Sequence, residues 1–216
     1  MIAFNIDISL DDYDHAPLYE RIAVRCPSLT EISGCEIDDQ GLLALSMISN
    51  STLTDIKFTR TYPLSDNEID RLCKGCPYLT RLSVGYTNPL TDASVRSIVS
   101  YCPCIERLSL SGWRHITDDS MVTLTALSLL KEIDLSDCSE LTSAGVQSLL
   151  RSIGASLEVL TLWSGDDYFE CKFCNDAFLR CIGAYCPKLN ELQRPGGIAL
   201  DYISAISPPH KGLALG

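Results

Sequence analysis

The chain has 216 residues, and its 28 acidic and 17 basic side chains give a net charge of −11 at pH 7. Phosphate backbones are bound by basic surfaces, so this balance argues against a nucleic-acid partner. The first 16 residues hold four aspartates, and no stretch reaches the roughly 18 uninterrupted apolar residues of a membrane span, so we expect neither a signal peptide nor a membrane partner. A protein of the cytoplasm or the nucleus is predicted.

The 11 cysteines indicate core packing rather than a disulfide framework. An odd number cannot pair completely, and thiols stay reduced in an intracellular compartment. Four of the cysteines stand directly before a proline: Cys26, Cys76, Cys102 and Cys186. A small buried thiol at a recurring position is typical of a repeated core site.

Residues 1–25 are predicted to form a degenerate first unit, with a strand at Ile8 and Leu10 and a helix at Tyr19 and Ile22. From there on, one apolar anchor recurs along the chain. The anchors are Leu29, Leu53, Leu79, Ile105, Leu130, Leu157 and Leu189. The steps between them are 24, 26, 26, 25, 27 and 32 residues. This period matches a leucine-rich repeat of about 20–29 residues, with one enlarged unit.

Four successive anchors are followed by the same strand pattern, with apolar residues three and five positions later. The pattern is seen at Leu79-x-x-Leu82-x-Val84, Ile105-x-x-Leu108-x-Leu110, Leu130-x-x-Ile133-x-Leu135 and Leu157-x-x-Leu160-x-Leu162. Alternation of this kind predicts a short strand with one face inward.

A turn and a helix follow each strand. The turns end in PLTD at 89–92, HITD at 115–118 and ELTS at 140–143, and their Thr, Ser and Asp side chains can cap the helix that starts there. Apolar residues then recur with a spacing of three, as in Val95/Ile98, Met121/Leu124 and Val146/Leu149. Such spacing buries one stripe of a helix.

These units predict an α/β leucine-rich-repeat solenoid, because no unit can bury its apolar edges alone. We expect one domain over residues 1–194 with about seven to eight repeats, a parallel sheet on the concave side and helices on the convex side. Residues 195–216 contain PGG and PP and lose the pattern, so they are predicted to be a terminal cap or a loose tail.

Segments 76–92 and 102–118 share the pattern Cys-Pro-x-Leu/Ile-x-x-Leu-x-Val/Leu, followed later by Leu/Ile-Thr-Asp. This resembles the cysteine-containing leucine-rich repeat of F-box proteins, and of relatives without an F-box such as the antagonist-of-mitotic-exit proteins. The resemblance covers roughly residues 5–193. It implies a right-handed horseshoe arc of the ribonuclease-inhibitor type.

In F-box proteins these repeats recruit substrates to a cullin-type ubiquitin ligase, so the resemblance implies a substrate-recognition or adaptor module. The F-box itself, a helical segment ahead of the repeats, has no counterpart in residues 1–25. Contact with a ubiquitin-ligase adaptor is therefore expected only as part of a longer chain.

Residues two and four positions after each anchor point to the concave side of the predicted sheet. The first row is Glu31, Asp55, Arg81, Arg107, Glu132, Val159 and Glu191; the second is Ser33, Lys57, Ser83, Ser109, Asp134, Thr161 and Gln193. We predict a binding face for another protein or peptide at Asp55, Lys57, Arg81, Arg107, Glu132, Asp134 and, at a strand end, Trp163. Arg81 and Arg107 would anchor an acidic or phosphorylated segment. The alternative is a solvated face on which neighbouring charges pair, at about 0.2–1 kcal/mol each.

Further contacts are predicted at the edge of this face. Trp113 and Arg114 follow a strand, and a Trp beside an Arg is typical of a binding hot spot, although Trp113 also takes a repeated Cys position and would then be core. The enlarged unit inserts Asp166, Asp167, Tyr168 and Phe169, which form either a lip of the binding face or an idle surface loop.

Neither a metal site nor an active site is expected. Cys171-x-x-Cys174 has the spacing of a zinc half-site, but Cys174 replaces the core Leu or Ile of other units. No phosphate loop or metalloprotease motif occurs. We therefore predict a non-catalytic protein-binding scaffold that needs no cofactor. The alternative is a structural subunit of a larger assembly.

Overall fold

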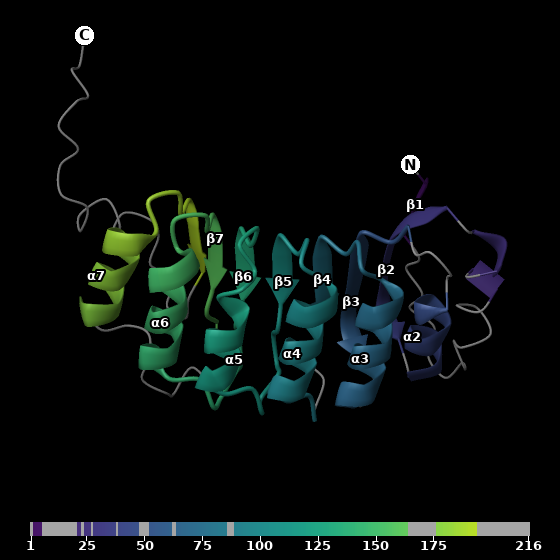
Figure 1. Ribbon diagram of the computed structural model, residues 1–216, viewed down its shortest axis with the longest axis horizontal. Helices are drawn as coiled ribbons and strands as arrows, with labels where there is room; N and C mark the ends of the chain where they lie inside the picture. The colour runs from purple at the N-terminus through teal and green to yellow at the C-terminus, as the bar shows by residue number, and fades with distance from the viewer. Residues whose placement is uncertain are drawn as a thin grey trace, which may run out of the picture.

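The computed structural model describes residues 2–5, 21–22, 24–26, 28–37, 39–47, 52–61, 64–85, 89–163 and 176–193. Strands and helices alternate along these residues (Figure 1). The strands are β1 (Ile2–Asn5), β2 (Leu29–Ile37), β3 (Asp55–Thr61), β4 (Arg81–Val84), β5 (Arg107–Ser109), β6 (Glu132–Asp134), β7 (Val159–Thr161) and β8 (Glu191–Gln193). The helices are α2 (Asp39–Ser46), α3 (Asp66–Gly75), α4 (Asp92–Tyr101), α5 (Asp118–Leu124), α6 (Ser143–Ile153) and α7 (Asp176–Tyr185).

The eight strands form one parallel sheet in the order of the chain, from β1 to β8. Successive pairs place Ile56 opposite Leu82, Leu82 opposite Leu108 and Leu108 opposite Ile133. All described helices lie on one side of this sheet (Figure 1). The predicted α/β repeat solenoid is thereby confirmed.

The strand of the first unit differs from the prediction. β1 lies at Ile2–Asn5 and pairs Phe4 with Ile32, whereas the sequence favoured Ile8 and Leu10, which lie outside the described residues. Phe4 and Ile32 are about one repeat apart in the sequence, so a strand at Ile2–Asn5 also fits the period of the array.

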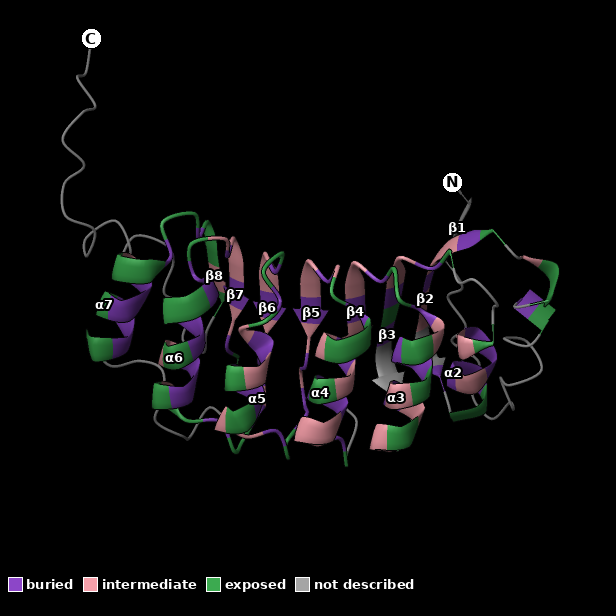
Figure 2. Ribbon diagram, viewed as in Figure 1, coloured by how far each residue is buried: buried purple, intermediate pink, exposed green. Residues whose placement is uncertain are grey.

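The core lies between the sheet and the helices. The anchors from Leu29 to Leu189 are buried, and so is the row of Ile32, Ile56, Leu82, Leu108, Ile133 and Leu160. Figure 2 shows the helices buried on the side that faces the sheet and exposed on the other. In β5, β6 and β7 only the central residue of each strand is buried, because the flanking residues point to the face without helices. We call that side of the sheet the open face.

Carboxylates link the helix starts of neighbouring repeats. Thr91, Thr117 and Thr142 are the N-caps of α4, α5 and α6, as predicted. Each of these threonines also donates to an aspartate at the start of the preceding helix. Asp92 of α4, for example, accepts from the Thr117 backbone N–H at 2.8 Å, the Thr117 hydroxyl at 2.9 Å and the Ser120 hydroxyl.

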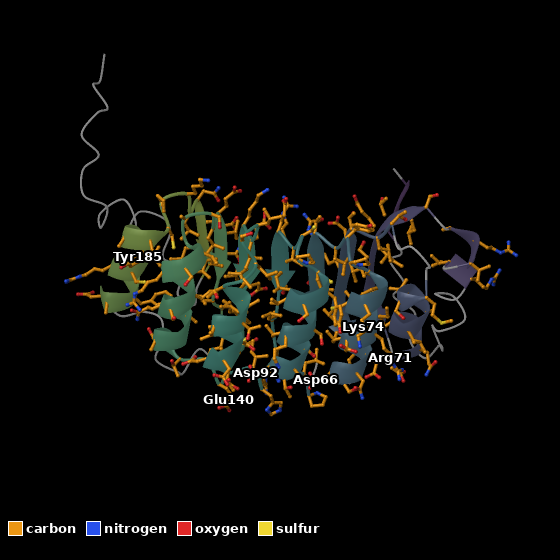
Figure 3. The ribbon with its side chains drawn as sticks, viewed as in Figure 1. Asp66, Arg71, Lys74, Asp92, Glu140 and Tyr185 are labelled. Carbon is orange, nitrogen blue, oxygen red and sulfur yellow. The ribbon has the colours of Figure 1, made fainter. Side chains whose placement is uncertain are left out.

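The same arrangement occurs one repeat earlier, where Asp66 of α3 accepts from Thr91 and Ser94. Figure 3 shows Asp66 and Asp92 at the same end of the helix layer. Burial raises the pKa of both carboxyls, but the hydrogen bonds from Ser and Thr outweigh it and lower the pKa of each. In the next repeat the donors to Asp118 within the described residues all belong to Thr142, because Gly145 stands where the serine would be.

The predicted core role of the repeated thiols agrees with their burial. Cys76, Cys102 and Cys186 are buried, whereas Cys26 is only half-buried against the core. The Cys102 thiol donates to the carbonyl of Cys76 at 3.5 Å. Burial raises the pKa of Cys186 to about 12. A thiol with a raised pKa is a poor nucleophile at neutral pH, so these groups are packing residues.

Candidate protein-binding face

The open face carries the two rows of side chains that the sequence places there. Strand register aligns Asp55, Arg81, Arg107, Glu132 and Val159 in one row. The second row aligns Lys57, Ser83, Ser109, Asp134 and Thr161. Six of the predicted contact residues therefore lie together on one surface: Asp55, Lys57, Arg81, Arg107, Glu132 and Asp134.

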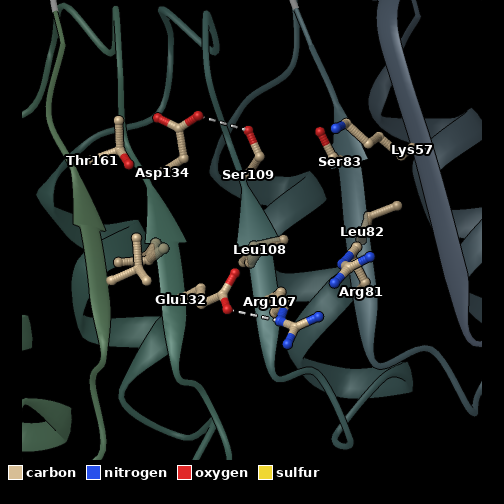
Figure 4. A pocket seen from close by; sticks show the side chains of 12 residues that line it. Lys57, Arg81, Leu82, Ser83, Arg107, Leu108, Ser109, Glu132, Asp134 and Thr161 are labelled. Carbon is tan, nitrogen blue, oxygen red and sulfur yellow. Dashed lines mark hydrogen bonds and ion pairs between the residues drawn. The ribbon is translucent and has the colours of Figure 1, made fainter. Parts of the chain in front are cut away.

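A shallow depression of about 350 Å³ occupies the middle of this face (Figure 4). Its rim is charged and hydroxylated, and its floor is formed by the strands themselves, whose central residues Leu82, Leu108 and Ile133 are buried. The lining residues are Lys57, Arg81, Leu82, Ser83, Arg107, Leu108, Ser109, Glu132, Ile133, Asp134, Val159 and Thr161. Apolar drug-sized ligands bind in deep apolar pockets, so this surface suits an extended polypeptide better.

The two arginines make ion pairs in opposite directions along the face. Arg81 Nη1 lies 3.1 Å from Asp55 Oδ1 on the β3 side. Arg107 Nε lies 2.8 Å from Glu132 Oε1 on the β6 side, at an angle that does not make a hydrogen bond. The Arg81 and Arg107 side chains remain 37% and 43% exposed. Exposed pairs of this kind contribute about 0–1 kcal/mol to stability, so the fold does not depend on them.

Asp134 is held by the fold itself. It accepts from the Ser109 hydroxyl at 3.1 Å and from the Ser136 backbone N–H at 2.9 Å. Lys57, in contrast, is exposed and has no ion pair or hydrogen bond within the described residues. Among the described residues of this face, Lys57 is therefore a cation without a partner, and Asp134 is a partly used acceptor.

The structure corrects the predicted role of Trp113. This side chain is 0% exposed, and its Nε1 donates to the Val84 carbonyl at 2.8 Å. A large indole fits the position that Cys138 takes in the next repeat because a backbone carbonyl is there to accept its N–H. Trp113 is a core residue and cannot contact a partner.

The other predicted edge residues have separate positions. Trp163 follows β7, is 45% exposed, and its backbone N–H donates to the Ser136 hydroxyl at 3.1 Å. Arg114 is exposed in the turn after β5. Asp166, Asp167, Tyr168 and Phe169 lie outside the described residues, as do Cys171 and Cys174.

Sequence reasoning did not single out Ser83, Ser109, Val159 or Thr161 as site residues, although they line the depression. Their signal was their register: they occupy the same two rows as the charged residues. Small polar side chains carry no functional pattern of their own, and only the shape of the assembled face indicates their role.

Within the described ranges, no group of three or more His, Cys, Asp or Glu side chains is arranged to hold a metal ion. Nor does any helix among those residues have the length and hydropathy to cross a bilayer.

Comparison with models of known families agrees with the repeat architecture. A family model described as Leucine Rich repeat matches residues 25–46 and 126–150. Among solved structures, the yeast Rad7–Elc1 complex contains a chain similar to this one, with 16% sequence identity and a TM-score of 0.42 over 82% of this chain and 72% of that chain. No curated protein matches the sequence. Two segments of the chain therefore match leucine-rich repeats, in agreement with the repeated strand and helix units of the structure.

Proposed function

We propose that this protein is a non-catalytic scaffold that holds a segment of another protein on its open face. We base the proposal on one observation: the central strands expose two aligned rows of charged and hydroxylated side chains around a depression that no described helix covers. Solenoids present extended surfaces of this kind to their partners. Scattered exposed ion pairs there do not stabilise the fold much, so a binding role accounts for them better.

We also propose that the protein has no catalytic activity. The buried thiols are poor candidates for nucleophiles, since burial raises the pKa of Cys138 and Cys186. His115 is exposed in a turn, and within the described residues its side chain makes no hydrogen bond to a nucleophile or a carboxylate of the kind a catalytic pair needs.

A finer proposal follows from the type of repeat. Cysteine-containing repeats of this pattern resemble those of F-box proteins, so we propose a substrate-recognition or adaptor role in ubiquitin ligation, in the cytoplasm or the nucleus. If the chain is part of a longer protein, an F-box or an equivalent segment would make the contact with the ligase adaptor.

Site-specific photo-cross-linking tests the binding face. A photoreactive amino acid is placed at Ser83 or Thr161 on the open face, and at Ser100 on the exposed side of α4 as a matched control. We expect covalent adducts with a partner protein in source cells from the first two positions and none from Ser100. Adducts from Ser100 alone would refute the open face as the interface and favour the structural-subunit alternative.

Mass spectrometry of the same samples tests the finer proposal. Recovery of a cullin adaptor together with the full-length protein would support the ubiquitin role. A partner that is cross-linked at the open face in the absence of any ligase component would leave the scaffold function in place and exclude the adaptor role.

A further inference from the structure

Two arginines stand opposite each other at the centre of the open face. Strand register pairs Arg81 of β4 with Arg107 of β5, and paired strands lie about 4.8 Å apart. Like charges directly opposite each other destabilise a sheet. Asp55 lies on the far side of Arg81 and Glu132 on the far side of Arg107, so neither carboxylate stands between the two cations.

Each arginine also keeps nitrogen donors that the described residues do not use. Asp55 contacts Nη1 of Arg81, and Glu132 contacts Nε of Arg107. In Figure 4 the Arg107 guanidinium extends from Glu132 over the side of β5 that faces β4, where Arg81 lies. The remaining donors of both guanidinium groups therefore face the depression.

Lys57 and Ser83 add two further donors to the same region. Lys57 of β3 pairs in register with Ser83 of β4, and Figure 4 shows its side chain reaching toward that serine. Ser83 follows Arg81 by two residues on the same face, about 6.6–6.8 Å along the strand. Within the described residues neither Lys57 nor the Ser83 hydroxyl has a hydrogen-bond or ion-pair partner.

The charge of this region differs from that of the whole chain. The protein has a net charge of −11, whereas the depression is lined by three cations, Lys57, Arg81 and Arg107, and two carboxylates, Glu132 and Asp134. Asp134 is already bound by Ser109 and Ser136. Asp55, which pairs with Arg81 at 3.1 Å, is a third carboxylate beside these cations. In the two rows the excess of positive charge therefore lies on β3, β4 and β5, where Lys57, Arg81 and Arg107 outnumber Asp55. Such a local excess is complementary to an anion.

We infer that Arg81, Arg107, Lys57 and Ser83 form a binding site for the phosphoryl group of a phosphorylated serine or threonine in a partner protein. The inference rests on the proposed scaffold function and names the chemistry of the segment that is bound.

A phosphoryl group fits this set of donors better than a carboxylate does. It carries about −1.5 to −2 charges at pH 7 and three acceptor oxygens, enough for two guanidinium groups and an ammonium at once. A carboxylate from the partner would carry one charge and would only replace Asp55 or Glu132 by a group of the same kind. Arginine forks also match phosphate oxygens in bidentate geometry.

The test uses the full chain and three degenerate peptide libraries that differ only at the central residue, which is phosphoserine, glutamate or serine. We expect the immobilised protein to retain the phosphoserine library about tenfold or more over the other two, since one additional charge-assisted hydrogen bond is enough for that ratio. The double variant Arg81→Gln/Arg107→Gln should lose this preference, and Lys57→Gln should reduce it.

The matched control is Arg71→Gln/Arg96→Gln, which removes the same charge from the exposed side of α3 and α4. It should retain the phosphoserine library as the wild type does. Inorganic phosphate at constant ionic strength should shift the NMR signals of Arg81, Ser83 and Arg107, and sodium chloride should not. Circular dichroism confirms that each variant is folded.

Three results would overturn the inference. The wild type retains the serine and phosphoserine libraries equally, or the α3/α4 control loses as much retention as the open-face variant. The third such result is that a single-stranded oligonucleotide displaces the bound phosphoserine library as effectively as free phosphoserine peptides do. That result would assign the site to nucleic acid.

Failure of this inference can be told apart from failure of the scaffold function. If a Thr161 cross-link to a partner still forms in a cell extract that was treated with phosphatase before irradiation, the open face binds protein without using a phosphoryl group. If no open-face cross-link forms at all, the scaffold proposal itself is wrong.

Discussion

Replacing Asp92 by alanine tests the carboxylate links between repeats. Asp92 accepts hydrogen bonds from the Thr117 N–H, the Thr117 hydroxyl and the Ser120 hydroxyl, and all three join α4 to α5. A hydrogen bond to a charged group contributes about 1.5–3 kcal/mol. Because bonds that share one acceptor are not additive, we expect Asp92→Ala to lower the free energy of unfolding by about 2–3 kcal/mol.

Asp119→Ala is the matched control. Asp119 lies in the first turn of α5 and is exposed. Within the described residues its backbone N–H donates to Thr117 and its carbonyl accepts from the Thr123 hydroxyl, but its carboxylate makes no hydrogen bond. Its carboxylate contributes chiefly through the helix dipole, about 0.3–1 kcal/mol. Urea unfolding gives the free energy of unfolding of both variants, provided that their m-values equal that of the wild type. Equal losses for Asp92→Ala and Asp119→Ala would refute the reasoning.

The same link has a defined pH dependence. Because its hydrogen bonds lower the pKa of Asp92 in the folded state, this group stabilises the fold above the unfolded pKa of about 3.9 and loses that effect as the pH falls through the lower folded value. The difference in stability between wild type and Asp92→Ala should therefore be largest at neutral pH and shrink in acid. A difference that does not change with pH would mean that the charge of Asp92 is not involved.

Three further substitutions, with Trp163→Phe as a control, probe the packing of the repeats by thermal and urea unfolding. Gly75→Ala should destabilise by about 1–3 kcal/mol, because an added Cβ would lie 2.3 Å from the Ser46 carbonyl oxygen of the preceding helix; an unchanged midpoint would contradict this. Gly145→Ser should stabilise by about 1 kcal/mol once the Asp118 carboxylate moves aside, since Ser94 and Ser120 make this bond in sister repeats; a loss of stability would show that Asp118 cannot move. Trp113→Phe should lower the free energy of unfolding by about 1–3 kcal/mol, because it leaves the Val84 carbonyl without its donor. Trp163→Phe, at an exposed site, should leave the free energy of unfolding almost unchanged. Similar losses at both positions would contradict the buried placement of Trp113.

Much of the fold is predictable from local periodicity. The anchors and the apolar residues three positions after them lie in register, as in Leu82, Leu108 and Ile133, because one inward ridge per unit is the solution that buries every unit's apolar edge. Alternation along a strand then decides which residues reach the open face. Arg81, Arg107 and Lys57 could be placed there without a structure for this reason.

Local periodicity does not decide how side chains pair across repeats. Arg81 is flanked by Asp55 and Arg107, and Arg107 by Arg81 and Glu132, but which carboxylate each cation contacts depends on rotamers and on the spacing of the assembled strands. The link from Asp92 to Thr117 was likewise unpredicted, because the aspartate reads as a capping residue of its own helix.

The sequence alone determined the repeat, its strand faces and the rows of charge, since each follows from spacing within a unit of about 26 residues. The tertiary structure decided that Trp113 is core and that the aspartates at helix starts join neighbouring units. It also decided that two arginines stand opposite each other with nitrogen donors that no described residue uses. These features depend on contacts between residues about one repeat apart, and only the stacking of the units sets those distances.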